Sequence, residues 1–190
     1  MTKNYSESIR KQFEYYKLLG EKTIAQLPDE KLSWQFNKES NSIAVIIKHL
    51  WGNMLSRWTD LFTTDGEKPW RERDAEFDND INTKEELMAK WDEGWKCLFD
   101  SIDSLKEEDL QKEVFIRNMG QTVTEALNRQ LAHYAYHVGQ IVFIGKMICN
   151  EGWISLSIPR GGSKTYNEEK FSTPKHKEHF TDEFIQKKKE

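Results

Sequence analysis

The strongest constraint on the fold is that apolar residues recur three or four positions apart in four long segments of the sequence. This spacing places apolar side chains on one face of an α-helix. It predicts helices over residues 5–27, from about 41 to 62, from about 83 to 105, and from about 122 to 150. Long connections follow the second and third segments. The pattern therefore predicts an all-α protein, a four-helix bundle with long crossover connections.

Residues that commonly begin or end helices flank these segments. Pro28 stands where the first helix should stop, because proline cannot continue the backbone hydrogen-bond ladder. Hydroxyl and amide side chains can accept hydrogen bonds from free N–H groups at a helix start. The candidate N-cap residues are Asn41 or Ser42 for the second helix, Thr83 for the third, and Thr122 or Thr124 for the fourth.

The remaining segments carry little helical pattern. Residues 63–80 contain a glycine, a proline and many charges, which predicts a long surface connection. Residues 106–123 include one strand-like run, VFI, and a turn signal at 118–120, so they predict a crossover that can include a hairpin. Residues 151–190 are expected to be an extended or looped tail that packs on the bundle or on a partner. We treat 1–190 as a single domain with its core at about 5–150.

Composition narrows the class of protein. The chain has 190 residues, of which 37% are hydrophobic, enough for a core without disulfides. Cys97 and Cys149 are too few and too far apart for a disulfide framework and are expected to be reduced. A net charge of −4 with mixed signs argues against a nucleic-acid partner. No apolar run is long enough for a signal-peptide core or a membrane span, because the best one, near Ile141, is broken by Lys146. A cytoplasmic protein is expected.

Three histidines are predicted to face the apolar interior. His133 and His137 stand four positions apart in HYAYH of the fourth helix, and His49 follows Val45 and Ile46 on the apolar side of the second. Residues four apart on a helix are about 6 Å from one another, which lets two imidazoles meet one metal ion. The three together could form a facial metal site with open positions. The alternative is that each is a core histidine hydrogen-bonded to a backbone carbonyl or a tyrosine.

Small and polar residues lie beside these histidines. Gly52, Asn53 and Ser56 follow His49 by about one and two turns, where a pocket could open. Asn53 and Gln140 could orient the ligands or a bound substrate. The alternative is that they are ordinary polar residues at the edge of the bundle.

Two other uses of the histidines are disfavoured. The HYAYH segment lacks the glutamate that follows the first histidine in zinc-protease helices, so peptide hydrolysis is not expected. His176 and His179 lie among charged residues of the tail and are expected to be solvated.

The segments IIKHLWGNM and HYAYHVGQI, each with inward histidines, resemble the DinB-like superfamily, which includes the YfiT-like proteins. More narrowly, SIAVIIKHLWGNMLSRWTDLFTTDGEKPWR and WISLSIPRGGSKTYN resemble an uncharacterised, mainly Bacillus-type branch, a domain of unknown function. The resemblance implies a four-helix bundle, commonly dimeric, with three histidines that hold a divalent metal such as nickel or zinc. The ligands here would be His49, His133 and His137. Characterised relatives include thiol-dependent isomerases and S-transferases that use mycothiol, bacillithiol or glutathione.

Two functional hypotheses follow. The first is a metal-dependent thiol S-transferase that uses a low-molecular-weight thiol such as bacillithiol as co-substrate, because a metal lowers the pKa of a bound thiol. The second is a non-catalytic metal-binding or structural homodimer. Both include a homodimer, since seven tryptophans and long helices exceed what one thin bundle readily buries.

Overall fold

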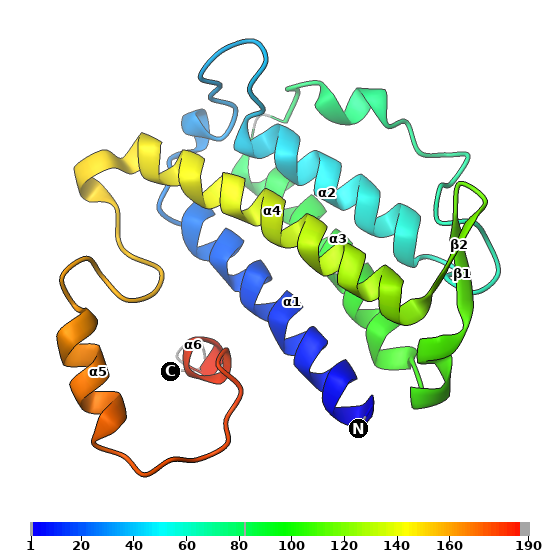
Figure 1. The fold of residues 1–190 in the computed structure, drawn as a ribbon. Helices are drawn as coiled ribbons and strands as arrows, with labels where there is room; N and C mark the ends of the chain where they lie inside the picture. The colour runs from blue at the N-terminus through cyan, green and yellow to red at the C-terminus, as the bar shows by residue number, and fades with distance from the viewer. Residues whose placement is uncertain (1, 82, 187–190) are drawn as a thin grey trace.

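A computed structural model describes residues 2–81 and 83–186, and four long helices dominate it (Figure 1). They are α1 (Thr2–Ile24), α2 (Ile43–Trp58), α3 (Lys84–Ser104) and α4 (Val123–Cys149). Helix α2 packs on α3 and on α4, while α1 packs on α4 and on α3. The all-α class is confirmed. The finer description as a four-helix bundle with crossover connections stays a prediction.

Side-chain caps start three of these helices. The Oγ of Ser42 accepts from the backbone N–H of Val45 at 3.1 Å, and Thr83 caps α3 in the same way. Thr122 caps α4, and Glu125 reaches back to the backbone N–H of Thr122 at 2.7 Å, which completes a capping box. The candidates Ser42, Thr83 and Thr122 are therefore the residues used.

Two helices end earlier than their apolar patterns predict. Helix α1 ends at Ile24 rather than at Leu27, where the chain continues as a turn. Helix α2 ends at Trp58 rather than near residue 62, because Thr59 is extended and Asp60 has a left-handed φ of 50°. The N–H of Thr59 still donates to the carbonyl of Leu55, and the left-handed backbone at Asp60 then leaves the helical path.

The core lies between the apolar faces of the four long helices, and aromatic rings fill much of it. Trp95 and Tyr134 are fully buried, and their ring centroids are 5.8 Å apart. The indole N–H of Trp58 donates to the hydroxyl of Tyr134 at 3.0 Å, and that hydroxyl donates to Oδ1 of Asn53 at 3.1 Å. This buried chain of hydrogen bonds fixes α2 against α4, next to the histidines.

The connection over 63–80 is not a simple surface loop. A short 3₁₀ helix, η2 (Asp74–Phe77), packs against α2, and Glu76 within it is 5% exposed. The hairpin is present: β1 (Glu113–Ile116) pairs antiparallel with β2 (Met119–Thr122). Arg117 and Asn118 both have positive φ, as a tight hairpin turn requires. Further 3₁₀ helices are η1 (Asp29–Lys31), η3 (Glu107–Gln111) and η4 (Asn150–Gly152).

The expectation of an extended or looped tail is wrong, because two short helices form there, α5 (Ser163–Phe171) and α6 (Asp182–Gln186). Helix α6 lies against α1 (Figure 1), where Asp182 pairs with Lys11 at 2.9 Å. His179 was expected to be solvated but is half-buried, with its Nε2 3.0 Å from Oγ of Ser8. His176 is exposed, as predicted.

The two cysteines pack against the core. Cys97 and Cys149 are free thiols and half-buried. Within the described residues, no helix has both the length and the apolar character needed to cross a membrane.

Candidate metal centre

The three predicted histidines meet between α2 and α4. Each of His49, His133 and His137 offers one ligand atom, and these atoms lie within 4.8 Å of one another. The Nε2 of His133 is 3.4 Å from Nε2 of His49 and 3.1 Å from Nε2 of His137. Nitrogens that bind one tetrahedral ion at about 2.0–2.1 Å are themselves roughly 3.4 Å apart. The three histidines could therefore hold a divalent metal ion.

The other ring nitrogen of two histidines is held by an oxygen. Nδ1 of His49 lies 2.9 Å from Oε2 of Glu76, and Nδ1 of His137 lies 2.9 Å from Oε1 of Gln140. A carboxylate or amide oxygen can only accept, so Nδ1 carries the proton in both rings. The lone pair is then on Nε2, which faces the other histidines. Such outer partners orient metal-binding histidines in known sites.

Glu76 itself is fixed by Arg71. The guanidinium donates from Nε to Oε1 at 2.7 Å and from its terminal nitrogen to Oε2 at 2.9 Å, and the Arg71 side chain is 2% exposed. Burial alone would raise the pKa of Glu76, but the hydrogen bonds from His49 and Arg71 outweigh it and lower that pKa. Glu76 is therefore an anion under the histidine cluster.

Gly52 makes room for this carboxylate. A Cβ atom at Gly52 would overlap Oε1 of Glu76 and lie 2.9 Å from its Cδ. Gly52 was predictable from the sequence as a small residue beside His49, but Glu76 and Arg71 were not, because both come from the connection that was expected to lie on the surface. The only sequence signal was the high density of charges in residues 63–80.

His133 and His137 are uncharged at neutral pH. Burial lowers the pKa of His133 to about 3, and the neighbouring His137 and His49 add to the shift. Burial likewise lowers the pKa of His137 to about 4, against the opposing hydrogen bond to Gln140. Because a metal binds the neutral imidazole, both rings are ready to coordinate at physiological pH.

The two predicted orienting residues lie at the site in different ways. Gln140 holds His137, as described above. Asn53 lines the cavity beside the histidines, but its Oδ1 is engaged by Tyr134. Phe77 stacks on the ring of His49 with a centroid distance of 5.5 Å. Among the residues that the structure describes, no tyrosine is hydrogen-bonded to any of the three histidines.

A family model described as "Protein of unknown function (DUF1572)" matches residues 1–162, which include α1 to α4 and all three histidines. The chain belongs to the DUF1572 family. No curated protein and no solved structure matches it. Membership of an uncharacterised family is thus confirmed, whereas the assignment to the DinB-like superfamily stays a prediction.

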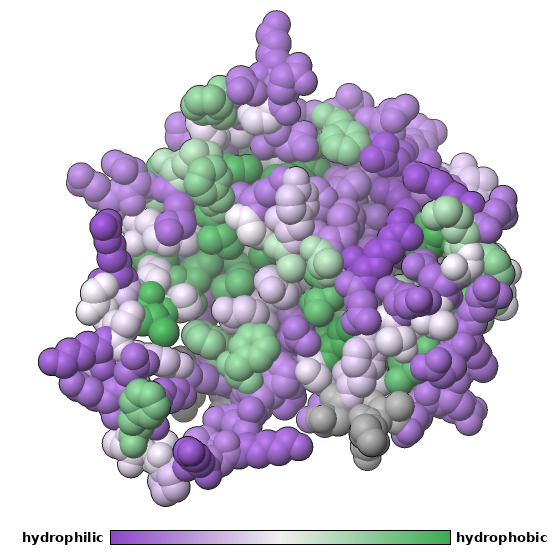
Figure 2. Space-filling view, in the orientation of Figure 1, coloured by the Kyte–Doolittle hydropathy of each residue, from purple (hydrophilic) through white to green (hydrophobic). Residues whose placement is uncertain are grey.

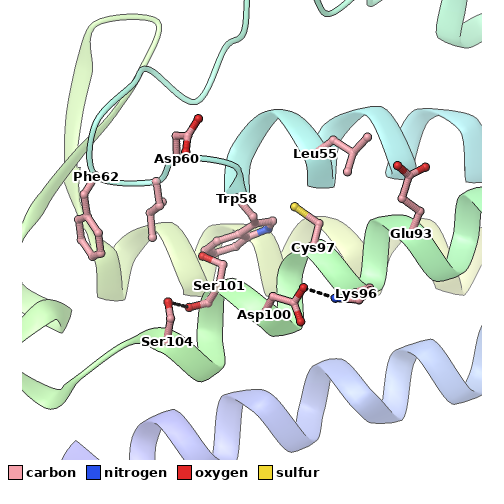
Figure 3. Close-up of a pocket in the computed structure, with 11 residues that line it drawn as sticks. Leu55, Trp58, Asp60, Phe62, Glu93, Lys96, Cys97, Asp100, Ser101 and Ser104 are labelled. Carbon is pink, nitrogen blue, oxygen red and sulfur yellow. Dashed lines mark hydrogen bonds and ion pairs between the residues drawn. The ribbon is translucent and has the colours of Figure 1, made fainter.

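This DUF1572 protein has a second hollow of about 540 Å³ between α2 and α3, where Figure 3 shows Cys97 beside Trp58. Burial raises the pKa of the Cys97 thiol, and its hydroxyl neighbour is Thr59 at 3.6 Å. Lys96, the nearest cation in sequence, pairs with Asp100 instead (Figure 3). A thiol in these surroundings is protonated and a weak nucleophile. The histidine cluster is therefore the stronger candidate for chemistry.

Proposed function

We propose that this chain binds one divalent metal ion, nickel or zinc, through His49, His133 and His137. The observation that carries the proposal is the convergence of three Nε2 atoms at 3.1 and 3.4 Å, with the Nδ1 atoms of two rings held by Glu76 and Gln140. Imidazole nitrogens suit both metals. Three protein ligands leave a coordination position open, as in catalytic sites.

The DinB-like assignment is part of the same proposal. It rests on the segments IIKHLWGNM and HYAYHVGQI, whose histidines come from α2 and α4. The packing of four long helices around these segments is consistent with a four-helix bundle that has long crossovers between α2 and α3 and between α3 and α4.

The reaction we propose is thiol S-transfer with a low-molecular-weight thiol such as bacillithiol as co-substrate. When bound, a divalent ion supplies a Lewis acid that lowers the pKa of a thiol. The chain supplies the rest: Glu76 and Gln140 keep the Nε2 lone pairs aimed at one point, and Phe77 shields His49 on one side. The cavity beside the histidines measures about 350 Å³, which is enough for a small molecule.

The second candidate function is a non-catalytic metal-binding or structural homodimer. It is favoured by an apolar groove of about 730 Å³ along α4, whose exposed apolar side chains are Phe36, Tyr136, Phe143 and Met147. Figure 2 shows hydrophobic residues gathered toward the C-terminal half of α4. A second copy of the chain could cover this groove, and we propose a homodimer under both functions.

The deciding experiment is metal analysis of protein purified without a histidine tag or chelator. We expect close to one divalent ion per chain, and a large loss of metal after dialysis in His133→Ala and His49→Ala. His176→Ala is the matched control, since this histidine is exposed in the tail. Full metal content in both site variants would rule out the three-histidine centre.

A further inference from the structure

Five of the seven arginines in the sequence line the cavity beside the histidines. They are Arg57, Arg71, Arg73, Arg117 and Arg129. Among the residues that the structure describes, no lysine, aspartate or glutamate lines it. The whole chain has a net charge of −4, so this concentration of positive charge runs against the overall composition. In Figure 2 hydrophilic residues predominate on the side of the molecule nearer the hairpin, with some hydrophobic residues among them.

The carboxylates near the cavity do not neutralise it. Glu76 takes both hydrogen bonds of Arg71, while Glu67 is shared by Arg57 at 3.2 Å and Arg117 at 3.0 Å. Asp65 also interacts electrostatically with Arg57, so three carboxylates lie among five guanidinium groups and positive charge remains in excess. Arg71 and Glu67 are 3.7 Å apart, so even the paired arginines share their partners.

Two of the arginines have no carboxylate partner within the described part of the chain. Arg73 lies over the ring of Phe77 at 5.7 Å, and Phe77 in turn stacks on His49. Arg129 is exposed and stands one helical turn before His133 on α4. Both guanidinium groups are therefore available to a ligand next to the histidines.

Arg57 adds a buried donor. Its side chain is 8% exposed, its terminal nitrogens bind Gly66 and Glu67, and its Nε has no hydrogen-bond acceptor among the described residues. Burial and the neighbouring Arg71 both lower the pKa of Arg57. An anion in the cavity would offset this repulsion between the two guanidinium groups.

We propose that this cavity binds the anionic group of a small-molecule substrate, a carboxylate or a phosphate. Guanidinium groups match the two-oxygen geometry of both anions, and lysines do not. With a volume of about 350 Å³, the cavity accommodates one small anionic molecule whose other end reaches the histidines. The anion site stands on the arginines alone, whereas its role in holding an acidic thiol substrate rests on the proposed function.

The test uses metal-free full-length protein, so that coordination to a metal cannot contribute. Binding of inorganic phosphate and of succinate is measured by titration calorimetry at low ionic strength, for the wild type and for Arg73→Gln and Arg129→Gln. Each substitution should weaken binding of the preferred anion by about tenfold, the value of one charge-assisted hydrogen bond. The stronger of the two anions identifies the substrate class. Arg160→Gln, which removes an exposed arginine far along the tail, should leave the affinity unchanged.

The outcomes separate this inference from the metal proposal. Failure of both anions to bind, or equal losses in Arg160→Gln and the cavity variants, would overturn the anion site while leaving metal content untouched. Anion binding without any metal uptake by the protein would refute the metal centre and keep the anion site. Unchanged affinity in both cavity variants would also overturn the inference, because Arg73 and Arg129 are the two arginines without a partner.

Discussion

The Nδ1 atom of His49 lies 2.9 Å from Oε2 of Glu76, and the two residues are 27 positions apart in the sequence. This contact ties the connection after α2 to the candidate metal centre. Because the carboxylate is also bound by Arg71, the His49 ring has one orientation and one tautomer.

Glu76→Gln should therefore weaken metal binding. Glutamine keeps the size of the side chain but loses the charge that favours the proton on Nδ1 of His49. Loss of a residue that hydrogen-bonds to a metal-binding histidine typically lowers metal affinity about 10- to 100-fold. Competition with a chromophoric zinc chelator at pH 7.5 measures the change. Glu151→Gln, at an exposed position in η4, is the charge-matched control and should bind zinc as the wild type does. Equal affinities for wild type and Glu76→Gln would mean that the contact does not act on the metal.

Gly52→Ala tests the same contact through packing. The added methyl would overlap Oε1 of Glu76 and lie 2.9 Å from its Cδ, so the carboxylate must move away from His49 and Arg71. We expect weaker zinc affinity and lower stability to urea. In Gly139→Ala, where a Cβ meets nothing within 4 Å, alanine should instead raise stability by about 0.5–1 kcal/mol through its helix preference. If both variants gained stability, Glu76 would not need the space at Gly52.

The pH dependence of stability in the metal-free protein follows from the buried imidazoles. In the unfolded chain these histidines titrate near pH 6.5, but in the fold the pKa is about 3 for His133 and about 4 for His137. Below a pH of about 6.5 the unfolded state therefore binds more protons than the folded state does. The free energy of unfolding falls as the pH drops from about 6.5 toward 4. Urea unfolding in the presence of chelator, at several pH values, should show this loss.

A double variant, His133→Gln with His137→Gln, isolates the effect of these groups. Its stability should fall less over the same pH interval, because glutamine does not titrate. Carboxylates with lowered pKa values, such as that of Glu76, contribute to acid sensitivity in both proteins and cancel in the comparison. Parallel curves for the two proteins would show that the histidines titrate normally in the fold.

The histidine cluster could be predicted from sequence because each of the three histidines lies on a strongly periodic helix. A helical period fixes which face a residue occupies, so His49, His133 and His137 could be placed inward without any knowledge of the neighbouring chain. Caps such as Ser42 were predictable for a similar reason, since they depend on residues only three positions away.

The partners of the cluster could not be predicted in this way. Glu76 and Arg71 lie in an irregular segment whose path is decided by contacts with α2, and no local rule links them to His49. The helix α5 was missed because its residues form no apolar face, and α6 depends on contacts with α1 such as Lys11 with Asp182. Neither α5 nor α6 has the periodic apolar pattern from which a helix is predicted.

The proposed homodimer should give a mass of about 45 kDa by light scattering at micromolar concentration, twice the chain mass of 22.5 kDa. Phe143 lines the apolar groove and is 63% exposed, so Phe143→Glu should place a charge in the interface and shift the mass toward that of a monomer. Phe171→Glu is the control, because this residue is 85% exposed in α5 and outside the groove. A monomer mass for the wild type at every micromolar concentration measured would refute the dimer.

The catalytic prediction concerns thiol transfer. Metal-loaded protein should accelerate the conjugation of bacillithiol to an electrophile beyond the rate with free metal, and His137→Ala should abolish the excess. The substitution removes one of the three converging nitrogens but leaves the core of Trp95 and Tyr134 intact, so circular dichroism should stay helical. His176→Ala should retain the full rate.

Comparison of thiols tests which function the site serves. Bacillithiol and glutathione carry carboxylates and should react faster than cysteamine, a thiol without one, if the arginine-lined cavity holds the co-substrate. In Arg129→Gln this preference should shrink, with the larger change in KM, while the rate with cysteamine stays the same. If metal-replete protein shows no excess rate with any thiol and a broad set of electrophiles, the transferase proposal fails. The three histidines would then hold a metal that braces α2 against α4, which is the non-catalytic function.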